Sequence, residues 1–192
     1  MAKKESSFLN MVLTLLMITF IASAALGYLY ELTKGPIAAS KLAKLNNAIT
    51  QVVPEFDTIP SSEIYKIGVD GDTLVFYPAM KDSVLVGTAV STFTNNGFSG
   101  YIKLMVGFLP DGTIHNISVL EHKETPGLGD KMTKKKSNWS VQFNGKNPAE
   151  FKLKVTKDRG DVDAITASTI SSRAFCDAVD RAYKAYMEGG KK

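Results

Sequence analysis

Several hydroxyl side chains are clustered in residues 163–172 (DAITASTISS), directly before a segment whose apolar spacing predicts a C-terminal helix. Serine, threonine and aspartate cap helices by accepting a hydrogen bond from a free backbone N–H, and one such residue is enough. A helix start also offers unpaired N–H groups and the positive end of the helix dipole, which together bind phosphate. The run therefore predicts either a phosphate site or capping alone. Its candidate residues are Asp163, Thr166, Ser168, Thr169, Ser171 and Ser172.

A compact turn at residues 125–129 (TPGLG) is a second candidate for ligand binding. Glycine has no Cβ, so Gly127 and Gly129 would let the backbone approach a flat ligand closely. Leu128, between them, would rest against an apolar ring. Taken alone, the same residues are also typical of an ordinary surface turn.

Ser99-Gly100-Tyr101, at the start of a predicted strand, is a weaker third candidate. The small pair precedes an aromatic side chain that would line a pocket, although a plain strand entry has the same pattern. The two histidines and the single cysteine, Cys176, are too few for a His/Cys metal cluster and exclude an intramolecular disulfide. We expect Cys176 to fill space in the core.

These candidates must be positioned by a sheet, because residues 55–122 are rich in short apolar runs with turn signals between them. The clearest hairpin joins residues 101–109 to 113–120 through Pro110-Asp111-Gly112. Residues 121–147 are irregular, which in a compact domain indicates a functional or a mobile stretch. The predicted fold class is α+β, with a mainly antiparallel sheet and flanking helices. The expected strands cover residues 61–69, 72–79, 83–94, 101–109 and 113–122, with 151–155 as a further candidate.

The first thirty residues predict a membrane helix. No charged residue lies between Ser6 and Tyr30, and residues 8–29 are long enough to cross a hydrocarbon core of roughly 30 Å. A cleaved signal peptide is the alternative, because Lys3 and Lys4 precede the apolar run and residues 22–24 (ASA) resemble a cleavage site. The expected organisation is a cytoplasmic N-terminus (1–7), a transmembrane helix (8–30), a linker helix (31–54) and an exported domain (55–192). Gly35-Pro36 is expected to interrupt the helical chain after the membrane segment.

The net charge of +4 does not indicate a nucleic-acid partner, because an exported, anchored domain rarely meets nucleic acid. Four lysines lie close together without interleaved aromatic residues, which is typical of a solvated loop near anionic lipid headgroups. They are Lys131, Lys134, Lys135 and Lys136.

In their order and spacing, the anchor, the hairpin, the ETPGLG loop and the DAITASTISS segment resemble the FMN-binding domain found in the G subunit of Rnf electron transport complexes and in the C subunit of sodium-pumping NADH:quinone reductases. In that family a flavin transferase joins the phosphate of FMN to a threonine hydroxyl, and the matching residue here is Thr169. One departure is Ala167, which stands where the family has glycine and would strain a backbone with positive φ. The resemblance extends cofactor binding to Glu124, Thr125, Gly127, Leu128, Gly129, Ser99 and Tyr101.

The resemblance implies an electron-carrying flavoprotein subunit with covalent FMN, within a membrane complex that couples electron transfer between ferredoxin and NAD to sodium or proton movement. It implies the other subunits of the complex, a flavin transferase and membrane lipid as partners, with the FMN domain on the extracytoplasmic side of the cell membrane. The chain would be a redox subunit and not an enzyme alone, so no acid, base or nucleophile is assigned. The alternatives are the C subunit of the quinone reductase, or a membrane-tethered binding or assembly module without flavin.

Overall fold

The computed structural model describes residues 8–59, 63–69 and 72–189. The chain divides into two compact units, with the boundary between Ala43 and Lys44. Residues 1–7, which we expect in the cytoplasm, lie outside the described residues.

Helix α1 (Phe8–Val52) contains the predicted membrane segment. Among the described residues it is the one helix long and apolar enough to cross a membrane. The predicted interruption at Gly35-Pro36 is wrong, because α1 continues through Pro36. Proline removes one N–H donor from the helical ladder, and the surrounding alanines, leucines and lysines are strong enough helix formers to continue the helix.

The domain is built on a five-stranded antiparallel sheet whose strands follow one another in chain order. Each strand pairs with its sequence neighbour, as expected for short connections between antiparallel strands. This sheet and the two long helices confirm the predicted α+β class. The strands are β1 (Tyr65–Val69), β2 (Asp72–Lys81), β3 (Val84–Gly97), β4 (Gly100–Phe108) and β5 (Ile114–His122).

The predicted hairpin at Pro110-Asp111-Gly112 is confirmed between β4 and β5. Gly112 has a φ of +90°, which favours glycine over other residues. The Asp111 carboxylate accepts hydrogen bonds from the backbone N–H and the hydroxyl of Thr113, both at 2.9 Å. These bonds lower the pKa of Asp111, and they lock the turn that sets the register of the two strands.

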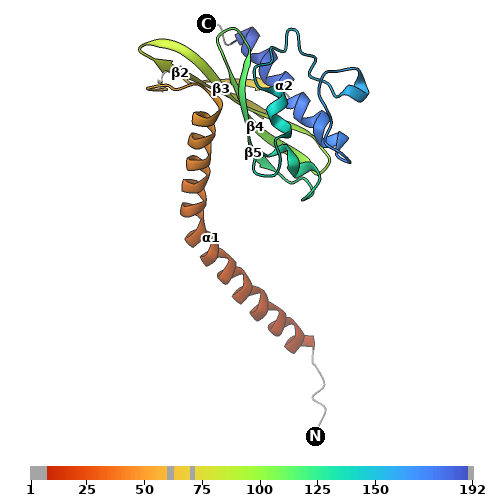
Figure 1. The fold of residues 1–192 in the computed structure, drawn as a ribbon. Helices are drawn as coiled ribbons and strands as arrows, with labels where there is room; N and C mark the ends of the chain where they lie inside the picture. Colours follow the sequence, from red (N-terminus) through yellow and green to blue (C-terminus); the bar gives the residue numbers. More distant parts are fainter. Residues whose placement is uncertain (1–7, 60–62, 70–71, 190–192) are drawn as a thin grey trace. The chain divides into compact units, whose positions relative to one another are not determined.

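Helix α2 (Thr169–Gly189) packs on one face of the sheet, where Figure 1 shows it in blue. The predicted apolar face is confirmed, since Phe175, Val179 and Tyr186 are fully buried, and Cys176 is buried beside them. The last turn of α1 packs on the opposite face through Ile49 and Val52. The core therefore lies on both sides of the sheet.

Residues 123–168, between β5 and α2, are mostly turns and short 3₁₀ helices. These helices are η2 (Gly129–Met132), η3 (Trp139–Phe143) and η4 (Thr156–Asp158). The predicted strand at residues 151–155 is wrong, because only Val155 forms an isolated bridge, with Val162. Met132 in η2, Phe143 in η3 and Val155, directly before η4, are fully buried, so these three residues anchor the connection in the core.

Candidate functional site

The hydroxyl-rich run forms the N-terminus of α2, as its composition predicts. Ser168 is the capping residue: its carbonyl accepts the first helical hydrogen bond from the Ser172 N–H at 3.0 Å. The Ser172 hydroxyl donates to the same carbonyl at 3.0 Å and accepts a hydrogen bond from the Ile165 N–H at 2.9 Å. Thr169 is the first residue of the helix.

The first N–H groups of α2 are available to a ligand. Within the described part of the chain, no group accepts a hydrogen bond from the backbone N–H of Thr169, Ile170 or Ser171. The positive end of the helix dipole lies at the same place, and the first turn carries no acidic residue. The helix start is therefore suited to an anionic group such as phosphate.

The residue before the cap, Ala167, has a φ of +61°. This left-handed conformation suits glycine and costs other residues free energy, because the Cβ crowds the following carbonyl. The positive φ that we considered for this position is confirmed. Ala167 therefore carries backbone strain directly beside the helix start.

A cavity of about 330 Å³ lies at this helix start. Three chain segments form its wall: the tip of the β3–β4 hairpin, the loop after β5 and the first turn of α2. Its lining residues are Phe98, Glu124, Thr125, Leu128, Ala167, Ser168, Thr169, Ile170 and Ser171. The structure thus brings together the three segments that the sequence singled out separately.

The TPGLG loop is a tight turn in which the Leu128 N–H donates to the Thr125 carbonyl at 3.2 Å. Gly127 has a φ of +79° and open space around it, so it is needed for its conformation. Gly129 is needed for close packing, because a Cβ there would lie 2.6 Å from Glu124 Oε2 and 2.7 Å from Ser171 Oγ. The close approach that we expected toward a flat ligand is, at Gly129, an approach to the protein's own side chains.

Glu124 connects the three segments of the wall. The residue is 5% exposed, and its carboxylate accepts hydrogen bonds from the Ser99 N–H at 3.0 Å and from the Ser171 hydroxyl at 2.6 Å. The Ser171 and Ser168 hydroxyl oxygens are 3.2 Å apart. Glu124 therefore ties the hairpin tip and the helix start to the loop after β5.

The rim of the cavity is apolar and open to solvent. Phe98 is 68% exposed, Ile170 47% and Leu128 40%. Phe98 and Ile170 were missed by the sequence reasoning. The available signals were an aromatic residue beside the Ser99-Gly100 pair and an apolar residue inside the hydroxyl run.

Several predicted site residues do not line the cavity. Asp163 and Thr166 are exposed, and the Asp163 backbone is held elsewhere, by hydrogen bonds with Trp139 and Gln142. Ser172 is buried, and its hydroxyl makes the capping hydrogen bonds described above. Tyr101 stacks on Phe93 with ring centres 6.2 Å apart and donates its hydroxyl to Asp72 at 3.4 Å.

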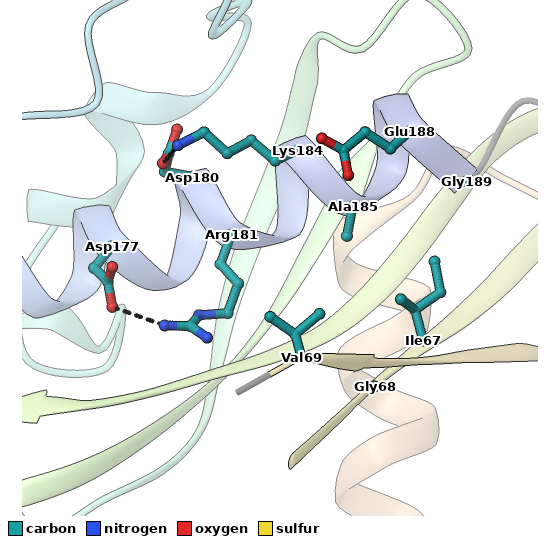
Figure 2. Close-up of a pocket in the computed structure, with 10 residues that line it drawn as sticks. All are labelled: Ile67, Gly68, Val69, Asp177, Asp180, Arg181, Lys184, Ala185, Glu188 and Gly189. Carbon is teal, nitrogen blue, oxygen red and sulfur yellow. Dashed lines mark ion pairs between the residues drawn. The ribbon is translucent and has the colours of Figure 1, made fainter. Parts of the chain in front are cut away.

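A larger cavity of about 570 Å³ lies between β1 and the second half of α2 (Figure 2). In Figure 2 Asp177 faces Arg181. Their charged groups are 3.6 Å apart, and the Arg181 guanidinium lies 5.0 Å from the centre of the Phe93 ring. This cavity extends toward the negative end of the α2 dipole, which disfavours phosphate. Its charged side chains fit a structural role in holding the helix on the sheet.

In the lysine cluster, Lys131 lies in η2 and the other three lysines follow that helix. Lys135 and Lys136 are exposed, and Lys134 donates to the Asn116 side chain. Burial lowers the pKa of Lys134. The residues that the structure describes contain no group of three or more His, Cys, Asp or Glu side chains that could hold a metal ion.

Comparison with known proteins shows the family of the chain. The FMN-binding domain family matches residues 97–184, which include all three segments of the cavity wall. The chain is 34% identical over 174 residues to the G subunit of the ion-translocating oxidoreductase complex of Shewanella amazonensis, covering 84% of this chain and 80% of the relative. It is 33% identical over 171 residues to the G subunit of Vibrio cholerae (84% and 82% covered) and 34% identical over 191 residues to that of Aliivibrio fischeri (92% and 90%). The chain therefore belongs to the G-subunit family of ion-translocating oxidoreductase complexes and carries that family's FMN-binding domain.

Proposed function

We propose that this chain is an electron-carrying subunit of a membrane-bound, ion-translocating ferredoxin:NAD oxidoreductase, with FMN esterified through its phosphate to Thr169. The observation that carries the proposal is the position of Thr169. It is half-buried in the cavity wall, at the first residue of α2, where three N–H groups are available. A phosphodiester on its hydroxyl lies where those groups and the helix dipole offset its charge.

The rest of the cavity suits the flavin ring. An isoalloxazine is flat and largely apolar, and the exposed rim residues Phe98, Leu128 and Ile170 supply apolar surface beside Thr169. Exposed apolar residues that gather around one cavity indicate a binding surface. Glu124, Thr125, Gly127, Gly129 and Ser99 would shape the wall behind that surface.

Attachment requires an activated flavin donor. Direct condensation of FMN with the threonine hydroxyl would release water, and in aqueous solution the equilibrium of that reaction favours hydrolysis. The donor is a flavin phosphoanhydride such as FAD, delivered by a flavin transferase. The bond from Thr169 Oγ to the flavin phosphorus forms, the anhydride P–O bond breaks, AMP leaves, and the hydroxyl proton is lost to the transferase or to water. Thr169 supplies the oxygen, and the remaining residues of the cavity orient it.

Bound flavin supplies transfer of one or two electrons, and the protein supplies its position and electrostatic surroundings. No residue of the cavity is assigned as an acid or base. A single membrane helix cannot form an ion path, so other subunits of the complex carry the sodium ions or protons. The helix anchors the chain in the cell membrane, with the FMN domain on the extracytoplasmic side. The relatives described above are all G subunits, which favours this reading over the C subunit of the quinone reductase.

The test is to express the full chain with a flavin transferase and to examine denatured protein by in-gel flavin fluorescence. The wild type and Thr166→Val are expected to fluoresce, because Thr166 is exposed outside the cavity. Thr169→Val, which keeps the shape and removes the hydroxyl, is expected to be dark. A wild type without fluorescence would contradict covalent attachment of flavin and would favour the non-flavin binding module.

A further inference from the structure

Five hydroxyl side chains lie within seven residues at the start of α2, and only one of them can be the acceptor of a single flavin. They are Thr166, Ser168, Thr169, Ser171 and Ser172. Thr166 is exposed and does not line the cavity, and the Ser172 hydroxyl is fully buried in capping bonds. Ser168, Thr169 and Ser171 all line the cavity, so a further feature must choose among them.

The direction of the hydrogen bonds supplies that choice. The Ser171 hydroxyl donates its one proton to Glu124 Oε2 at 2.6 Å. In its 3.2 Å contact with Ser168, Ser171 can then only accept, so Ser168 is the donor. Both serine protons therefore point along a chain that ends at Glu124. In the described part of the molecule the Thr169 hydroxyl has no such partner.

The packing around Glu124 keeps this chain in place. A Cβ at Gly97 would lie 2.7 Å from Glu124 Oε1, and a Cβ at Gly129 would lie 2.6 Å from Oε2. Oε1 accepts a hydrogen bond from the Ser99 N–H, as Oε2 does from the Ser171 hydroxyl. Each carboxylate oxygen thus has one donor and one glycine against it, and the carboxylate has a single orientation.

We propose that Glu124 directs flavin attachment to Thr169. By binding Ser171, and through it Ser168, Glu124 fixes the orientation of the two competing hydroxyls, and it leaves Thr169 as the cavity-lining hydroxyl that can turn toward the flavin donor. Glu124 is a positioning residue in this role. The inference rests on the proposed function, since it concerns which hydroxyl receives the flavin.

The test uses purified full-length chain in detergent, a flavin transferase and FAD, with the modified residue located by mass spectrometry. Trypsin releases residues 160–173 as one peptide that contains all five hydroxyls. The variant is Glu124→Gln, whose amide has one acceptor for two donors. The matched control is Glu121→Gln, an exposed carboxylate three residues earlier.

We expect the wild type and Glu121→Gln to be modified at Thr169 alone. Glu124→Gln is expected to be modified about tenfold more slowly, as loss of a hydrogen bond to a charged group predicts, with part of the flavin on Ser168 or Ser171. Modification of Glu124→Gln at the wild-type rate and at Thr169 alone would overturn the inference and leave the proposed function standing. A wild type without flavin would overturn both.

A second variant separates positioning from loss of folding. Ser171→Ala removes both the donor to Glu124 Oε2 and the acceptor of the Ser168 proton, and it is expected to place part of the flavin on Ser168. Adding Glu124→Gln to Ser171→Ala is expected to slow modification little further, because the two residues act through one chain. Independent, multiplicative effects of the two substitutions, or a Ser171→Ala protein modified at Thr169 alone, would contradict the role of Glu124.

Discussion

Ala167 is the residue of the cavity whose side chain conflicts with its backbone. A left-handed φ costs a residue other than glycine roughly 1–2 kcal/mol, and part of the stability gained by glycine is offset by its greater chain entropy in the unfolded state. We therefore predict that Ala167→Gly raises the free energy of unfolding by about 0.5–1 kcal/mol. Urea denaturation measures this change.

The control for that substitution is Ala164→Gly, in the same segment but outside the residues with positive φ. It is expected to lower stability by at least about 0.5–1 kcal/mol, because glycine adds chain entropy to the unfolded state and the substitution removes a methyl group that packs against the core. If Ala167→Gly destabilises the chain as much as Ala164→Gly does, the positive φ at position 167 carries no strain.

Cys176 is a second residue with a testable property. Burial raises the pKa of its thiol to about 12. Since the unfolded thiol ionises near its ordinary value of 9.0 and the folded one does not, the stability that this thiol contributes is complete below pH 9 and is lost as the pH rises toward 12. At pH 8 we expect no reaction of the folded chain with a maleimide and full reaction in denaturant. Labelling of the folded chain would show that the thiol is accessible.

The position of the hydroxyl run at a helix start could be predicted from the sequence, because capping residues have a local signature, and the helix does begin at Thr169. The positions of Phe98 and Ile170 at the cavity could not be predicted, because an exposed apolar residue leaves no periodic pattern. Asp163 and Thr166 belong to the run but lie off the cavity. The reason is a long-range contact: η3 holds the Asp163 backbone through Trp139 and Gln142.

At the scale of elements, the site depends on how closely the loop after β5 packs against the start of α2. Gly129→Ala would press a methyl group against Glu124 and Ser171, so we predict a loss of about 1–3 kcal/mol in stability, as for other overpacked sites. The measurement is urea unfolding. Gly68→Ala, in β1 with open space around it, is the control and is expected to be neutral.

The strands were predictable because their apolar runs are long and are separated by turn signals, as at Asp111-Gly112. The segment 151–155 alternates in the same way but does not form a strand, because only Val155 has a bridging partner. At Pro36 the sequence predicted an interruption that does not occur, because strong helix formers on both sides continue the helix through the proline. Local patterns therefore predicted elements best where tertiary pairing agreed with them.

At the scale of the whole molecule, the proposed topology places the FMN domain outside the cytoplasm. We predict that Lys135→Cys, on the exposed lysine cluster, reacts with a membrane-impermeant maleimide in intact spheroplasts. The wild type is the control, because its one cysteine is buried. Labelling that appears only after the membrane is permeabilised would place the domain on the cytoplasmic side.

Fragmentation of the tryptic peptide 160–173, from chain produced with a flavin transferase, measures directly whether Thr169 carries the flavin. We predict one FMN phosphoryl group on this peptide, with every fragment that contains Thr169 carrying it and every fragment that lacks Thr169 free of it. Flavin on Thr166 or on a serine of the wild-type peptide, or an unmodified peptide, would contradict attachment at Thr169.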